Sequence, residues 1–283
     1  MRELLPNAQT TGRMVAASGK GTAAAYDAAT MPFSFERVNA TDYDELRPMY
    51  APEAIRWVAD RARLESGSLV VDLAAGTGQL SRRLVRLGVR VVAVEPAANM
   101  RAVLSASLPD VTAVPGAAEA IPLGDGEADA VVVGNAFHHF DAEAAFAEIR
   151  RVLRPRGALA LLWARTDRHA DGLHLGIGEI DEVVERERAS SPILDAYRSW
   201  FEPPERIEGF TALERRSFPT TRTMASARLV DLYATSSDIA SLPEPRRIRL
   251  LERIGELAAD LRETLELAER SDVQLWFREG AGG

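Results

Sequence analysis

Short apolar runs alternate with stretches of helical spacing between residues 52 and 165. The runs are continuously apolar, which is typical of strands buried on both faces in a parallel sheet with helices on each side. The stretches between them repeat apolar residues three to four positions apart, as helices do. The predicted strands are 68–73, 89–94, 111–114, 128–133 and 158–163, and the predicted helices 52–63, 78–87, 97–107 and 140–153. This alternation predicts an α/β fold.

The rest of the chain follows other patterns. Residues 1–40 are small, polar and weakly periodic, which predicts a tail or a lid. The segment 167–209 is polar, has helical spacing and contains no buried-strand run. We interpret it as an insertion that covers another part of the molecule. Two more strands are predicted at 213–218 and 272–277. A helix is predicted at 246–270, with an apolar face formed by Leu250, Ile254, Leu257, Leu261 and Leu265.

Composition excludes several chemistries. The 283 residues contain no cysteine, so disulfides, thiol nucleophiles and cysteine zinc sites are absent, and Lys20 is the only lysine. Lys20 lies in a polar stretch without a preceding strand, which argues against a Schiff-base or P-loop lysine. A net charge of −8 argues against a nucleic-acid surface. No apolar run is long enough for a membrane helix and no signal peptide is visible, so we expect a soluble, cytoplasmic protein.

The most informative segment joins the first predicted strand to the following helix. Its strand ends at Asp72, and Ala74, Gly76 and Gly78 lie in the turn that opens the helix. Small residues at such a turn let a ligand approach the backbone closely, at the crevice beyond the strand ends. The alternative is a tight turn without a ligand.

An acidic residue ends the second predicted strand. Glu95 lies 19 positions beyond Gly76, and an acid about 20 residues after the glycine turn is the expected partner of ribose hydroxyls. The alternative for Glu95 is a solvated strand-end charge or a helix cap. Together the turn and the acid predict a nucleoside-type cofactor.

Several blocks in order resemble the class I S-adenosylmethionine-dependent methyltransferases, of the small-molecule group sometimes called type 11. The one departure is Ala74, where the family usually has its first glycine. The resemblance implies a doubly wound, mostly parallel seven-stranded sheet (a Rossmann-like methyltransferase fold) with a helical N-terminal lid and a helical insertion. We therefore divide a single domain into a lid (1–50), a cofactor-binding core (51–166), a substrate cap (167–210) and C-terminal strands and helix (211–283). The blocks lie at 72–78, 95–100, 116–123, 129–133, 135–140 and 152–157, with a further one at 43–50.

The same resemblance implies roles for individual residues. Asp72 through its turn, Ala74, Gly76 and Gly78 would flank the methionine part of S-adenosylmethionine. Glu95, followed by Pro96, would hold the ribose hydroxyls, and Met100, Ala118 and Glu119 would lie near adenine. Asn135 would contact the amino group through its backbone. Arg47 would pair with the carboxylate, which suits the guanidinium fork; its alternative is a surface arginine.

A nicotinamide dinucleotide is the competing cofactor on this kind of fold. Its usual turn has a third glycine, three positions beyond the second. Here that position is Ser81, and the later blocks have no meaning for a dehydrogenase.

Candidate catalytic groups lie beyond the fourth predicted strand. His138 and His139 are placed to act as a base, since an unperturbed histidine pKa is near 6.5. A lining or structural role is the alternative, and the sequence does not choose between the two histidines. With cysteine absent, tyrosines are the other candidates, and we include Tyr26 and Tyr43. Asp167 could orient a histidine, bind substrate or be a surface charge.

We expect a small-molecule acceptor, with no metal, nucleic acid or membrane as partner, in a monomer or homodimer. Aromatic residues of the lid and insertion favour an aromatic or heteroaromatic acceptor, including the carbon or nitrogen of an indole. An RNA or protein methyltransferase and a non-catalytic cofactor-binding protein are the alternatives. The aromatic residues are Tyr26, Phe33, Phe35, Tyr43, Tyr50, Trp163, Tyr197, Trp200 and Phe201.

Overall fold

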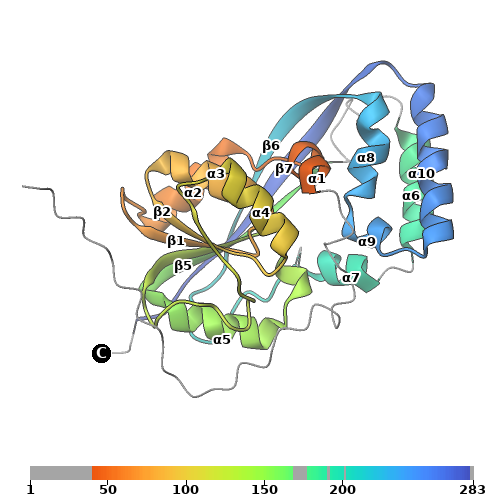
Figure 1. Ribbon diagram of the computed structural model, residues 1–283. Coiled ribbons are helices and arrows are strands. Elements are labelled where there is room, and N and C mark those ends of the chain that lie inside the picture. The colour runs from red at the N-terminus through yellow and green to blue at the C-terminus, as the bar shows by residue number, and fades with distance from the viewer. Residues whose placement is uncertain (1–39, 168–176, 190–191, 201, 281–283) are drawn as a thin grey trace, which may run out of the picture.

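A seven-stranded sheet forms the centre of the molecule in the computed structural model, which describes residues 40–167, 177–189, 192–200 and 202–280 (Figure 1). The strand order is β3-β2-β1-β4-β5-β7-β6. Neighbours from β3 to β5 pair in parallel, whereas β7 runs antiparallel to β5 and β6. The strands are β1 (Leu69–Leu73), β2 (Arg90–Val94), β3 (Thr112–Val114), β4 (Ala128–Gly134), β5 (Leu153–Thr166), β6 (Glu214–Ala225) and β7 (Thr264–Phe277). The expected doubly wound, mostly parallel sheet is confirmed.

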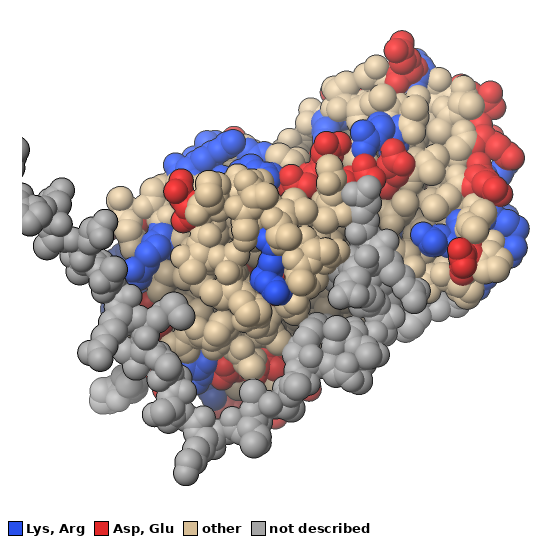
Figure 2. All heavy atoms as spheres, viewed as in Figure 1, with Lys and Arg blue, Asp and Glu red and all other residues tan. Residues whose placement is uncertain are grey.

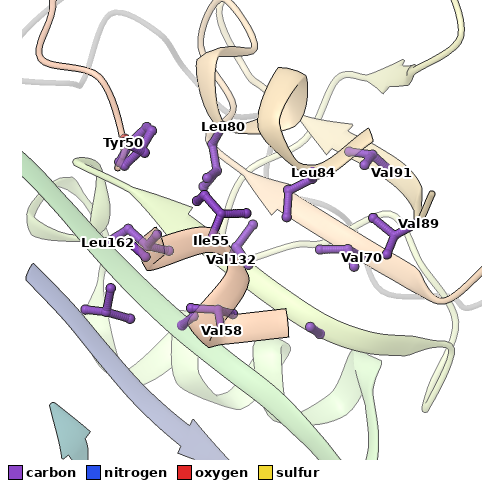
Figure 3. Packing of buried hydrophobic residues seen from close by; sticks show 14 of the residues in the cluster. Tyr50, Ile55, Val58, Val70, Leu80, Leu84, Val89, Val91, Val132 and Leu162 are labelled. Carbon is purple, nitrogen blue, oxygen red and sulfur yellow. The ribbon is translucent and has the colours of Figure 1, made fainter. Parts of the chain in front are cut away.

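Helices cover both faces of the parallel part, because alternate strand residues point to opposite sides. One face packs on α2 (Pro52–Ala62), α3 (Gln79–Leu84) and α4 (Ala98–Ser107), and Figure 3 shows Ile55 and Val58 beside strand residues such as Val132. The other face packs on α5 (Ala142–Val152), where Ile149 and Val152 are fully buried. The continuously apolar strands are therefore explained by burial on both sides.

A second group of helices, here called the helical lobe, packs on the far ends of β6 and β7 (Figure 1). It has its own core, in which Ile180, Leu229, Ile254 and Leu265 are buried together. Between the lobe and α4 lies α1 (Ala40–Leu46), which contacts both. The lobe consists of α6 (Gly178–Arg188), α7 (Pro192–Ser199), α8 (Leu229–Ala234), α9 (Ser237–Ala240) and α10 (Glu244–Ala259).

The prediction of a helix at 246–270 is wrong for the second half of that range. The helix α10 ends at Ala259, and from Thr264 onward the chain is strand β7. Leu261 and Leu265 continue the four-residue spacing, but Thr264 pairs with Ala225 of β6, a contact between residues distant in sequence. Pairing with β6 therefore overrides a local pattern that helix and strand share.

Candidate active site

The turn between β1 and α3 has left-handed backbone at Ala74 (φ 56°), Gly76 (φ 57°) and Gly78 (φ 87°). A Cβ on Gly78 would lie 2.9 Å from the Leu104 side chain, so close packing on α4 requires glycine there. A Cβ on Gly76 would meet no atom within 4 Å. The backbone at Gly76 is therefore open to a ligand, and the turn has the geometry that the motif predicted.

Asp72 lies behind this turn, with its side chain buried. Its Oδ2 accepts a hydrogen bond from the Ser81 hydroxyl at 2.6 Å. Burial raises the pKa of Asp72 to about 7, against the lowering effect of the Ser81 bond. Asp72 thus links the end of β1 to α3 and supports the turn between them.

Glu95 lies beside the same turn, directly after β2. The Gly76 N–H donates to its Oε2 at 2.9 Å, and the Ala97 N–H donates to its Oε1 at 2.8 Å. The residue is 5% exposed, and burial raises its pKa. A carboxylate has about four acceptor positions, so these two bonds leave capacity for ligand hydroxyls. The half-buried Pro96 follows it.

The residues expected near adenine take different positions. Met100 is buried and packs with Tyr43 and Ala97, so α1 covers it. Ala118 is buried in the core cluster that contains Leu73 and Val94. The carboxylate of Glu119 accepts the Asp141 N–H at 2.9 Å, just before α5 begins. Met100 and Ala118 flank the strand ends, and Glu119 keeps acceptor capacity beyond its bond to Asp141.

Asn135 follows β4 with a left-handed φ of 52°. Its side-chain amide makes two hydrogen bonds with Ala164, donating to the carbonyl at 3.1 Å and accepting the N–H at 3.0 Å. Its own N–H donates to Leu162. Asn135 thus holds the ends of β4 and β5 together and presents its backbone at the site.

His138 and His139 follow within a short 3-10 helix (Phe137–His139), with ring centroids 3.8 Å apart. Tyr197 of α7 packs edge-on against His138 at 5.1 Å, and Trp163 lies 5.9 Å away. Burial, with His139 and Arg47 nearby, lowers the pKa of His138 to about 2, and burial lowers the pKa of His139 to about 4. Both imidazoles are therefore neutral, and Nδ1 of His138 is buried without a hydrogen-bond partner among the described residues.

Arg47 is placed by α1 above the site. Its Nη1 donates to the Ser236 hydroxyl at 3.3 Å, and its guanidinium lies 5.6 Å from the centre of the Tyr43 ring. Its Nε is buried without a hydrogen-bond partner in the described part of the chain. A half-buried arginine with one donor unused in the described part of the chain fits a carboxylate ligand better than a surface role.

A cavity of about 260 Å³ lies between the helical lobe, Tyr43 of α1 and the ends of β4 and β5. Five of the residues predicted for the site line it, and so do Asp167, Tyr197 and residues of α6 to α9 that the sequence did not single out. The carboxylates on its wall have partners: for example, Asp238 pairs with Arg188, and Asp181 accepts from the Tyr233 hydroxyl at 3.0 Å. The candidates on its wall are Tyr43, Arg47, Asn135, His138 and His139.

The aromatic residues fall into three groups. Tyr43 and Tyr197 line the cavity, and Trp163 packs on His138 and Tyr197 behind it. Tyr50 is buried beneath Gly134, and Trp200 packs on Phe137 in the core. Asp167 lines the cavity 3.8 Å from Arg270. The predicted candidates Tyr26, Phe33, Phe35 and Phe201 lie outside the described residues.

Sequence reasoning missed Tyr233, Thr235 and Ser236, which lie on the cavity wall in and after α8. The polar run 235–237 was the only local signal for them. Within the described ranges, no group of three or more metal-ligating side chains is found, and no helix is long and apolar enough to cross a bilayer. Figure 2 shows charges of both signs scattered over the visible face.

Known proteins resemble the chain over most of its length. A methyltransferase domain model matches residues 71–161. An uncharacterized methyltransferase of Mycobacterium tuberculosis is 38% identical over 77% of this chain and 82% of its own. A demethylmenaquinone methyltransferase of Renibacterium salmoninarum is 31% identical over 43% of this chain and 56% of its own. A solved "Putative Type II Methyltransferase" from Anaeromyxobacter dehalogenans shares the fold with a TM-score of 0.59, at 24% identity over 82% of this chain and 97% of its own.

The mostly parallel seven-stranded sheet, the glycine turn joined to an acid and the similarity to the mycobacterial protein lead to one class. The chain belongs to the class I S-adenosylmethionine-dependent methyltransferases. It is an enzyme, and the predicted family is confirmed.

Proposed function

We propose that this enzyme binds S-adenosylmethionine across the glycine turn and transfers its methyl group to an uncharged aromatic or heteroaromatic small molecule in the cavity. The observation that carries the proposal is the hydrogen bond from Gly76 to Glu95, which fixes the turn and the acid in one site. When bound, the cofactor supplies an electrophilic sulfonium methyl group. The enzyme's own residues then need to align the acceptor and exclude water.

Four residues would hold the cofactor. Glu95 would accept the ribose hydroxyls with its remaining acceptor capacity, and the open backbone at Gly76 would lie against the methionine part. The buried Nε of Arg47 would donate to the carboxylate. Asn135 would meet the amino group through its backbone, since its side chain is already bonded to Ala164.

The acceptor class is supported by the cavity wall. Tyr197 presents a ring next to two neutral imidazoles, and the carboxylates there already have partners. Flat rings gain favourable edge and face contacts on such a wall. One relative is named a demethylmenaquinone methyltransferase, and we take this name as support for a small-molecule acceptor. The carbon or nitrogen of an indole is one such target.

His138 is favoured over His139 as the group that meets the acceptor. Its unpartnered Nδ1 would accept a hydrogen bond from an N–H or O–H of the acceptor and thereby orient it. Its low pKa makes it a weak base, so alignment contributes more than proton removal. Tyr43, on the same wall, is the second candidate.

RNA and protein substrates are the alternative acceptors. The mixed charge of the visible face and the net charge of −8 favour a small molecule over RNA. A monomer or homodimer in the cytoplasm remains part of the proposal.

Calorimetry and a methyl-transfer screen test the proposal. S-adenosylhomocysteine should bind the wild-type protein, and a library of aromatic small molecules should yield a methylated product where tRNA and peptides do not. Absence of S-adenosylhomocysteine binding would overturn the cofactor site. Transfer to RNA or protein alone would overturn the acceptor class.

A further inference from the structure

The helix α1 has no core of its own and is held by side chains from two sides. Toward the cofactor side, the Thr77 hydroxyl donates to Oδ1 of Asp44 at 2.9 Å, and Arg82 pairs with Oδ2 at 3.1 Å. The Gln79 amide donates to the Asp44 carbonyl at 2.8 Å. The glycine turn and the first turn of α3 thus hold one point of α1, and the carboxylate of Asp44 is the central acceptor.

Contacts with β6 and the lobe hold α1 on either side of Asp44, at Leu46 and Asp42. Arg222 donates to the Leu46 carbonyl at 2.9 Å and forms a buried ion pair with Glu269 at 2.8 Å. Arg228 pairs with Asp42 at 3.1 Å. These contacts do not involve Asp44, so α1 stays attached to the protein when Asp44 is changed.

Arg47 lies three positions beyond Asp44 and directly after Leu46, and its N–H donates to the Tyr43 carbonyl. Its guanidinium has one side-chain hydrogen bond in the described part of the chain, the 3.3 Å contact with Ser236. That single bond to a hydroxyl cannot fix the direction of a side chain with several rotatable bonds. The placement of Arg47 relative to the glycine turn therefore depends on where α1 is held.

We propose that Asp44 is a positioning residue: by joining α1 to Thr77 and Arg82, it sets Arg47 over the place where the amino-acid end of the cofactor lies. This rests on the proposed binding of S-adenosylmethionine at the glycine turn. Asp44 does not touch the cofactor and acts through Arg47. The group it serves is the carboxylate of the ligand and not the adenosine.

Two ligands separate this role from a general structural one. S-adenosylhomocysteine carries the amino-acid end, whereas 5′-methylthioadenosine keeps the adenosine and the sulfur but has no carboxylate. Titration calorimetry with both should be done on the wild type, Asp44→Asn, Arg47→Ala and the double variant. Asp44→Asn keeps the size of the side chain and turns an amide donor toward Arg82. Glu45→Gln is the matched control, since Glu45 is exposed on the same helix and lies 3.5 Å from Arg228.

We expect Asp44→Asn to weaken S-adenosylhomocysteine about tenfold, in the range of a charge-assisted contact, and 5′-methylthioadenosine less than about twofold. In the Arg47→Ala background the same change should add less than about twofold, because residues that act together are not additive. Glu45→Gln should bind both ligands like the wild type.

Several outcomes would overturn the inference. One is an equal loss of both ligands in Asp44→Asn, and another is multiplication of the two effects in the double variant. Unchanged S-adenosylhomocysteine binding in Asp44→Asn would also overturn it, with the cofactor site intact. A wild-type protein that binds neither ligand would instead remove the proposed function, and the inference with it. Retained 5′-methylthioadenosine binding also shows that each variant is folded.

Discussion

The proposed cofactor side, at the glycine turn and Glu95, and the proposed acceptor side, at the cavity wall, are assembled in different ways. The central bond of the cofactor side joins Gly76 to Glu95, which are 19 residues apart. On the acceptor side, the Tyr233 hydroxyl donates to Asp181 across 52 residues, and Trp163 bonds Gln274 across 111. The first side is one strand–turn–helix unit followed by the next strand. The second needs α1, the ends of β4 and β5 and the helical lobe at once.

This difference predicts that the two sides can be altered separately. The turn and Glu95 are fixed by backbone hydrogen bonds, so their loss should affect cofactor affinity whatever the acceptor. The cavity wall is made by side chains such as Tyr197. Substitutions in the cavity wall should change the rate of acceptor methylation and leave the affinity for the cofactor unchanged.

The largest expected effect is on the cofactor side. Glu95→Ala should weaken S-adenosylhomocysteine by about a hundredfold or more, since it removes a charged acceptor and leaves two buried N–H groups unpaired. Calorimetry measures the loss, and Tyr197→Leu is the acceptor-side control, which should bind within about twofold of the wild type. Wild-type affinity in Glu95→Ala would contradict the cofactor site.

A smaller effect is expected on the acceptor side. Tyr197→Leu should lower kcat/KM for an aromatic acceptor about tenfold, because the ring that packs on His138 and Trp163 is lost. Tyr197→Phe keeps the ring and should retain most activity. Steady-state kinetics at saturating cofactor measure both variants. Equal losses in both would assign the effect to the hydroxyl instead of the ring.

The histidines provide a test by pH. Their pKa values of about 2 and about 4 lie below the ordinary 6.5, so both stay neutral as the pH falls from 7.5 to 5.5. Over that interval kcat/KM should fall less than about threefold, whereas a histidine of ordinary pKa would lose about tenfold. The stability of the fold, unlike the activity, should depend on pH through these histidines. In the unfolded state they take up protons below about pH 6.5, so their contribution to the free energy of unfolding falls as the pH falls toward 4.

His139→Gln separates these two effects. Glutamine cannot be protonated here, so the variant should lose less of its unfolding free energy between pH 6.5 and 4.5 than the wild type does. Urea unfolding at a series of pH values measures this. An activity that drops tenfold below pH 6.5 would show that the catalytic histidine is far less buried than the structure has it.

The sequence predicted the local structure of the glycine turn well because its determinants are local. A continuously apolar strand, an acid at its end and small residues in the turn lie within about ten positions, and Glu95 ends the next strand. The acceptor side has no such unit. Leu265 fits a helix spacing equally well, and only pairing between β6 and β7 makes it a strand residue. Likewise Tyr233 reaches the cavity wall from a segment 52 residues away from its partner Asp181.

The smallest expected effect concerns Ala74, where the sequence departs from the family pattern. Its φ of 56° is costly for alanine, by roughly 1 kcal/mol, and glycine removes that cost but adds entropy to the unfolded state. Ala74→Gly should therefore raise the free energy of unfolding by about 0.5 kcal/mol and leave the affinity for S-adenosylhomocysteine within about twofold.

Arg63→Gly is the matched control, because Arg63 has a φ of 52° in the exposed cap of α2, away from the cofactor turn. The midpoint temperature of thermal unfolding should rise by roughly 1–2 °C in each variant. If Ala74→Gly instead weakened S-adenosylhomocysteine tenfold while Arg63→Gly did not, the alanine methyl would be a cofactor contact. Cofactor binding at the turn would then depend on the Ala74 side chain as well as on the backbone.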